Sequence, residues 1–298
     1  MNRRAKARRL IWARRIVQAA TLALFVLLLL STRASDPPAD RGWITLFFAI
    51  DPLVLLATFL ATHTVAGLSL LALVTVGVTL ILGRVFCGWI CPFGTLHNAA
   101  SWVRSRRSGK RRLLHAFSRW QRAKFLLLFG LVVMAILGVH WIGVFDPASV
   151  LYRSLATAFL PSIHQGIESG ATAVYQNDPR IGPLPLTAIT EPIYEFFRDR
   201  VFVVPSPAFV GAGIILFVFL AALILNLVRP RFWCRYVCPL GALLGLCAKR
   251  SSLRLVATEN ECTSCNLCTI ACPAAAQPEK PGEWLPTECF GCWNCVAA

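Results

Sequence analysis

The sequence has 298 residues, of which 56% are hydrophobic and only 15% charged, and its mean hydropathy is +0.62. This composition excludes an ordinary soluble domain, because several apolar runs approach the ~20 residues that cross the hydrocarbon core of a bilayer. The net charge of +16 is interpreted as a topological signal, since basic residues collect on the cytoplasmic side of membrane proteins. We therefore expect a protein in contact with membrane lipid and no nucleic-acid partner.

The apolar runs predict four spans with both termini in the cytoplasm. A basic cytoplasmic segment, 1–15, precedes the run Ile16–Thr32, which has no small-residue cleavage site and indicates an uncleaved first span. The run Trp43–Ala61 has Asp51-Pro52 at its middle, so we expect a re-entrant or interfacial element on the outer side. The other three spans are Gly67–Leu82, Lys124–Phe145 and Pro207–Val228, with a basic cytoplasmic loop at 104–123.

An internal repeat relates two membrane units, 16–103 and 124–255. Each contains a span, an Asp-Pro pair, a second span and a Cys-x3-Cys-Pro motif, which predicts a pseudo-two-fold axis along the membrane normal. The second unit is longer by an outer loop, about 152–206, that is rich in proline and polar residues. The expected fold class is all-α and polytopic, with four transmembrane helices in two parallel repeats. A small cytoplasmic α+β bacterial ferredoxin-like module follows, over 256–298.

The strongest motif is a cysteine run of the bacterial ferredoxin type, which binds a [4Fe–4S] cluster. A zinc site would favour two separated cysteine pairs instead. The members of this run are Cys262, Cys265, Cys268 and Cys272, with Pro273 directly after them.

A second run contains Cys289, Cys292 and Cys295. The fourth cysteine of such a run ligates the other cluster, so we expect Cys272 to complete this set. The matching fourth ligand of the first set would lie just past Ala298, which indicates a truncated module. Two [4Fe–4S] clusters are thus expected in the module, one of them lacking a ligand in this chain.

The two Cys-x3-Cys-Pro motifs follow directly from predicted spans at their cytoplasmic ends. Cysteines at i and i+4 would lie on one helical face, and the repeat symmetry would bring both pairs together. We therefore expect a third [4Fe–4S] cluster shared between the repeats; the alternative is a pair of thiol motifs that never meet. The four residues are Cys87, Cys91, Cys234 and Cys238.

Carboxylates and histidines near the outer face are further candidates. Asp51 and Asp146 precede proline, which favours helix capping, while a proton acceptor for a quinol is the alternative. His63 and His140 near the outer ends of spans are candidate haem ligands or proton carriers, against a role as unpaired interfacial residues. His97 follows the first cysteine motif and is placed to tune a cluster by hydrogen bonding.

The segments FCGWICPFG, WCRYVCPLGAL and ECTSCNLCTIACP resemble the NapH/NosR/CcoG-type membrane polyferredoxins, and the layout is most similar to NapH. The resemblance implies an oxidoreductase component in the bacterial inner membrane. It would pass electrons between the quinone pool, its substrate, and a partner iron–sulfur or haem carrier, as part of a quinol dehydrogenase. Two other functions remain open from the sequence: a redox assembly factor for a metalloenzyme, and a structural iron–sulfur membrane anchor.

Overall fold

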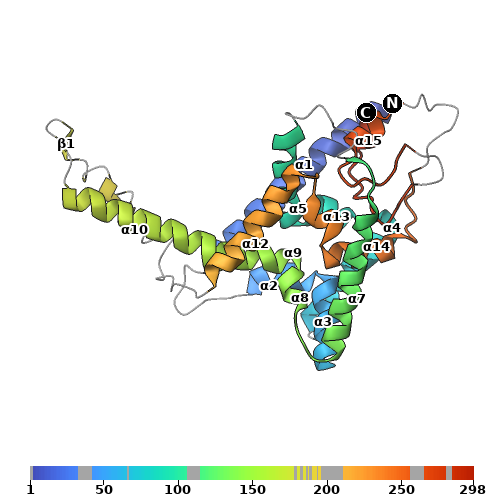
Figure 1. Ribbon diagram of the computed structural model, residues 1–298, viewed down its shortest axis with the longest axis horizontal. Helices are drawn as coiled ribbons and strands as arrows, with labels where there is room; N and C mark the ends of the chain where they lie inside the picture. The colour runs from blue at the N-terminus through green and yellow to red at the C-terminus, as the bar shows by residue number, and fades with distance from the viewer. Residues whose placement is uncertain are drawn as a thin grey trace.

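The structure, a computed structural model, is helical, and its segments far apart in sequence pack around one core (Figure 1). Among the described residues the only strands are β1 (Arg180–Ile181) and β2 (Leu184–Pro185), which pair antiparallel. The described residues are 3–32, 42–65, 67–105, 115–177, 211–255, 265–279 and 284–298, with short stretches between 180 and 195.

The first unit contains a long helix and a sharply bent helix pair. Helix α1 (Arg3–Ser31) includes the basic N-terminal segment in the same helix as the first apolar run. Helices α2 (Gly42–Ala49) and α3 (Pro52–Thr62) meet at 81°. The bend falls at Asp51, because proline at the first position of α3 cannot continue the preceding helix. The remaining elements are η1 (Gly67–Leu71), α4 (Ala72–Leu82), η2 (Phe86–Ile90) and α5 (Pro92–Ser105).

The second unit repeats this order with a longer middle. Its long apolar helices, α7 and α12, correspond to α1 and α4, and a short α8–α9 pair corresponds to α2–α3. The elements are η3 (Arg119–Arg122), α7 (Ala123–Ile136), α8 (Ile142–Phe145), α9 (Pro147–Arg153), η4 (Ser154–Phe159), α10 (Leu160–Asn177), α12 (Ala212–Ile224), η5 (Leu225–Leu227), α13 (Phe232–Tyr236) and α14 (Pro239–Ala248).

The region expected as an outer loop, about 152–206, is helical up to Asn177. Helix α10 has 18 residues and projects away from the remaining helices (Figure 1). A loop was expected because this region is rich in proline and polar residues, and Pro161 lies at the second position of the helix. Proline is tolerated in a first helical turn, however, because amides there have no partner within the helix.

The terminal module packs against the N-terminal part of the chain. Its helices are α15 (Leu267–Ala271) and α16 (Asn294–Ala297), and Arg14 Nη2 of α1 donates to Asn294 Oδ1 at 3.3 Å. The chain ends consequently lie together at one end of the molecule (Figure 1). Within 265–279 and 284–298 no strand is present, so the β part of the expected α+β module is not found there.

Apolar side chains cover much of the surface. By length and apolar composition one described helix, over Arg4–Ser31, could cross a membrane, or two if the bent α2–α3 pair forms one span. Only 22% of the apolar window in the first of these is buried. Large side chains on α1, α7 and α12 are exposed as well, among them Leu27, Phe129 and Phe217.

Candidate metal centres

The two Cys-x3-Cys-Pro motifs have matching local structures. In each, the amide of the second cysteine donates to the carbonyl five residues earlier: Cys91 to Phe86 at 3.0 Å and Cys238 to Trp233 at 2.9 Å. The second cysteine has an extended backbone and begins a new helix. The expectation that each pair lies on one helical face is therefore wrong. The following proline disfavours the helical conformation at the cysteine and breaks the helix there.

The second cysteine of each motif also caps the helix that it begins. The sulfur of Cys91 accepts the amide of Gly94 at 3.4 Å, and the sulfur of Cys238 accepts the amide of Gly241 at 3.2 Å. An amide hydrogen bond favours the thiolate over the thiol and tunes the potential of an iron–sulfur centre. The two repeats thus present a sulfur ligand in the same way.

All four membrane-motif cysteines converge in the core. Each is at most 7% exposed, and each interacts electrostatically with the other three. The alternative of two thiol motifs that never meet is therefore inconsistent with the structure. We refer to this group as the repeat centre; its members are Cys87, Cys91, Cys234 and Cys238.

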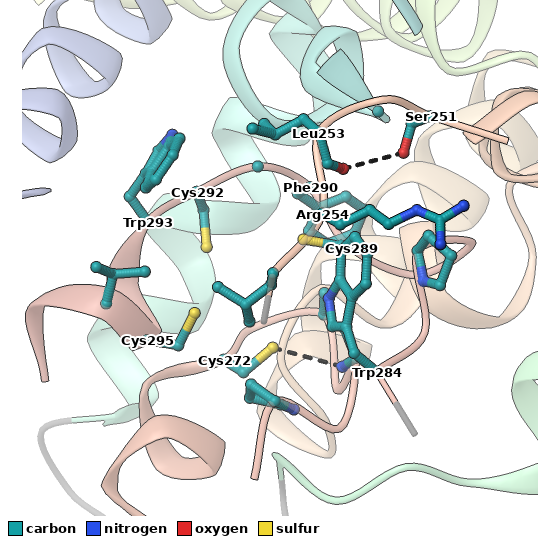
Figure 2. Close-up of a pocket in the computed structure, with 18 of the residues that line it drawn as sticks. Ser251, Leu253, Arg254, Cys272, Trp284, Cys289, Phe290, Cys292, Trp293 and Cys295 are labelled. Atoms are coloured by element: carbon teal, nitrogen blue, oxygen red, sulfur yellow. Dashed lines mark hydrogen bonds between the residues drawn. The ribbon is translucent and has the colours of Figure 1, made fainter. Parts of the chain in front are cut away.

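A second group of four cysteines lines a pocket in the terminal module (Figure 2). It joins Cys272 to the second cysteine run, as expected for crossed ligation. Burial, reinforced by the neighbouring Cys292, raises the pKa of Cys272 to about 12 and that of Cys289 to about 11, so a metal would have to displace protons to bind. We refer to this group as the terminal centre; its members are Cys272, Cys289, Cys292 and Cys295.

The other described cysteines of the ferredoxin run do not line this pocket. Cys265 is exposed and Cys268 is partly buried, while Cys262 lies outside the described residues. No three His, Cys, Asp or Glu side chains in the described ranges are close enough to hold a single metal ion. Four cysteine thiolates are the usual ligand set of a [4Fe–4S] cluster, and each of the two centres supplies four cysteines.

Buried cationic side chains lie around the two centres. They indicate whether an anionic group would fit there. Arg84 and Arg231 are fully buried, and each has two guanidinium nitrogens without a hydrogen-bond partner in the structure. Arg14 also has two such nitrogens among the described residues, and it interacts electrostatically with Cys292. Such groups are costly to bury unless negative charge compensates them. Four thiolates give a [4Fe–4S] cluster a net negative charge, so the residues present fit this cofactor.

The terminal module contacts the repeat centre through its backbone. A Cβ on Gly88 would lie 2.3 Å from the carbonyl oxygen of Phe290, so only glycine permits this approach. Trp89 Nε1 donates to the carbonyl of Gly291 at 3.0 Å. Gly88 follows Cys87 and Phe290 follows Cys289, which means that the two cysteine centres are in contact through neighbouring residues.

Comparisons with known proteins agree with this arrangement. The family described as "4Fe-4S binding domain" matches the chain twice, at 64–111 and 211–255. Each match contains one Cys-x3-Cys-Pro motif. The chain is similar to the NapH-type ferredoxin proteins.

Individual relatives support the same conclusion. The chain is 25% identical to ferredoxin-type protein NapH of Escherichia coli over 260 residues, covering 83% of this chain and 70% of NapH. It is 27% identical to methylamine utilization ferredoxin-type protein MauN of Methylorubrum extorquens, covering 74% of this chain and 59% of MauN. YccM of E. coli, named for electron transport, is 23% identical over 89% of this chain. The chain spans only 62% of the length of YccM, and no solved structure matches significantly.

The resemblance to NapH-type polyferredoxins is thus confirmed, and the doubled match supports the internal repeat. The family match covers the repeat centre rather than the ferredoxin run, which the sequence motif alone had made the stronger candidate. An iron–sulfur, ferredoxin-type electron-transfer protein is the class that these findings support.

Both Asp-Pro pairs act as helix caps. Asp51 Oδ1 accepts the amides of Leu53 at 2.8 Å and Val54 at 3.4 Å, and Asp146 Oδ2 accepts the amide of Ser149 at 2.8 Å. Beyond capping, the two carboxyl groups interact directly with each other. Two buried carboxylates in contact cannot both remain ionised, so the pair shares a proton.

The histidines are placed differently from one another. His63 and His140 are exposed, and His63 ends α3 in a left-handed conformation. His97 is fully buried, and its Nδ1 pairs with Asn226 Nδ2 at 2.7 Å. Burial lowers the pKa of His97 to about 4, so the ring is neutral and its Nε2 has no partner in the structure. His115 Nδ1, on which sequence reasoning placed no role, lies 2.9 Å from the carbonyl oxygen of Cys272.

Several residues of the site were missed from the sequence. Arg84 and Arg231 each lie three residues before the first cysteine of a motif, so alignment of the repeats could have found them. Glu288 is 3% exposed and pairs with Lys124 Nζ at 2.7 Å. No sequence signal links these two residues.

Proposed function

We propose that this protein is a multi-pass membrane electron-transfer subunit that moves electrons between the quinol pool and a partner iron–sulfur or haem protein. The carrying observation is the direct contact between the two cysteine centres through Gly88 and Phe290. When bound, [4Fe–4S] clusters would supply the one-electron carriers. The chain itself supplies the ligands, the buried cations and a short path between the centres.

The membrane placement rests on the exposed apolar surface. Leu27, Phe129 and Phe217 are 63%, 69% and 72% exposed on three different helices, which would be unfavourable in water. In lipid the same surfaces are satisfied. We place the four spans in the bacterial inner membrane with both termini and the 104–123 loop in the cytoplasm, following the excess of basic residues there.

The Asp51–Asp146 pair is the group best suited to accept a proton from a quinol. Oxidation of a quinol to a quinone releases two electrons and two protons, so an acceptor for protons is needed beside the electron path. The pair is buried, shares a proton and interacts electrostatically with Cys91 through Asp146. His63 and His140, being exposed, are candidates only for passing protons onward.

The test is iron content and low-temperature EPR on anaerobically purified protein. A variant with all four repeat-centre cysteines changed to serine is compared with Cys247→Ser, a partly buried cysteine outside both centres. We expect the quadruple variant to lose the iron and EPR signal of one cluster and to keep the signals of the terminal module. Unchanged iron and spectra would show that the repeat centre binds no cluster.

A second measurement addresses the quinol. A quinol analogue added to the wild-type protein in lipid should reduce the EPR-visible clusters, and the quadruple variant should lose reduction of its terminal clusters. Clusters that pass electrons to a metal or an oxidised thiol, and that quinol does not reduce, would favour the assembly factor instead.

A further inference from the structure

Two symmetry-related arginines stand beside the repeat centre. Arg84 and Arg231 each precede the first cysteine of a motif by three residues, so the repeat extends to Arg-x2-Cys-x3-Cys-Pro. Both side chains are 0% exposed. Each arginine taken alone is consistent with the excess of basic residues in a cytoplasmic loop. Charged side chains that only determine membrane topology lie in solvent, however. Their burial requires another explanation.

Neither arginine has its hydrogen-bonding capacity satisfied by the described residues. Arg84 Nη1 donates to the carbonyl of Thr287 at 2.6 Å and lies 3.7 Å from Glu288 Oε2. Arg231 Nη1 donates to the carbonyl of Cys87 at 3.4 Å. The Nε and Nη2 atoms of both have no partner there. The same two nitrogens are therefore left over in each repeat.

The guanidinium groups face the cysteine sulfurs. Arg84 interacts electrostatically with Cys87, Cys234 and Cys238, and Arg231 interacts with Cys234. A Cβ on Gly241 would lie 2.6 Å from Arg84 Nη2 and 3.5 Å from the sulfur of Cys238. The orphaned donor and the sulfur thus border the same small space, which glycine keeps open.

Both arginines also contact the terminal module. The ring of Phe290 lies under both guanidinium groups, at 5.0 Å from Arg84 and 4.7 Å from Arg231. These distances allow a cation–π interaction on each side. Because Phe290 follows Cys289, the pair sits between the repeat centre and the terminal centre.

We propose that Arg84 and Arg231 are paired positioning residues that stabilise the negative charge of the repeat-centre cluster, raise its reduction potential and seat Phe290 between the two centres. This inference rests on the proposed function, since it requires a cluster at the repeat centre. Reduction adds one electron, and hence one negative charge, to that cluster. Two adjacent positive charges favour the reduced form, and their removal disfavours it.

The test is an EPR redox titration of single variants, Arg84→Gln and Arg231→Gln, with iron content measured in parallel. Arg250→Gln removes an exposed charge at the end of α14 and is the matched control. We expect each test variant to lower the reduction potential of the repeat-centre cluster by at least about 59 mV. This shift is a tenfold change in the equilibrium constant for one-electron reduction. The reduction potential in the Arg250→Gln control should equal that of the wild-type protein.

Each other outcome has a defined meaning. Wild-type iron and unchanged potentials in both Gln variants would overturn the proposal. If a Gln variant loses the cluster, the Arg→Lys variant at that position decides: retained iron with a potential near that of the wild type supports a charge role, and lost iron overturns it. If serine substitution of the four cysteines removes no iron from the parent protein, the proposed function itself fails.

Discussion

The carboxyl groups of Asp51 and Asp146 contact each other in the protein interior, although they belong to different repeats. Each carboxyl group also caps a helix by accepting hydrogen bonds from backbone amides in the first turn of that helix. We expect Asp51→Ala to destabilise the protein by about 1 kcal/mol and Asp51→Asn by less, because asparagine keeps a capping oxygen. Thermal unfolding in detergent measures both. Equal losses for the two variants would show that capping is not the stabilising role.

Crossed ligation predicts different effects of two neighbouring cysteines. Cys272 lines the terminal centre with the second cysteine run, whereas Cys268 is partly buried outside this set. Cys272→Ser should remove most of the iron bound by the terminal centre, and Cys268→Ser should leave that cluster's EPR signal intact. Iron analysis of the two variants side by side checks this, and the opposite order of effects would exclude the crossed arrangement.

Gly88 should be intolerant of even one methyl group. Gly88→Ala would place a Cβ 2.3 Å from the Phe290 carbonyl oxygen, so the terminal module must shift away from the repeat centre. We expect faster hydrogen exchange over 284–298 and slower electron transfer between the centres. Gly77→Ala is the control, since a Cβ there meets nothing within 4 Å. Similar exchange in both variants would contradict the close backbone approach.

The ion pair between Lys124 and Glu288 is buried, with side chains 0% and 4% exposed. Glu288→Gln leaves the lysine without its carboxylate and should cost about 3–5 kcal/mol. The double change Lys124→Met with Glu288→Gln should recover part of this loss, because it removes the unpaired lysine charge while Arg84 still loses its contact with Glu288. Apparent melting temperatures of the single and double variants test the coupling; strict additivity would argue against it.

The proposed topology predicts the side of each loop. An epitope tag inserted in 104–123 should be protected from protease in intact spheroplasts, because that loop is assigned to the cytoplasm. A tag inserted in 196–206 should be cleaved, because that segment is assigned to the outer side. The opposite pair of results would mean that the protein has the opposite membrane orientation. The partner would then be reached from the other side of the membrane.

The repeat made much of the site predictable from the sequence. Cysteines at Cys87, Cys91, Cys234 and Cys238 could be grouped because a doubled motif implies an axis that brings equivalent residues together. The break within each motif was not foreseen, because helical periodicity was given more weight than the proline after the second cysteine.

Long-range polar contacts could not be predicted in this way. Alignment of the repeats pairs Arg84 with Arg231, but only the structure shows that both are buried beside Phe290. The pairing of Lys124 with Glu288 joins positions 164 residues apart. Helix α10 was expected to be a loop because its region is rich in proline and polar residues.

The terminal module is held against the helices of both repeats by specific side-chain contacts. Glu288 has its counter-charge on α7, Phe290 is held by arginines of both repeats, and Asn294 binds α1. Excised from the chain, residues 256–298 would lose these supports and expose apolar and charged groups together. The terminal module and the helical repeats therefore depend on each other for packing and for charge compensation.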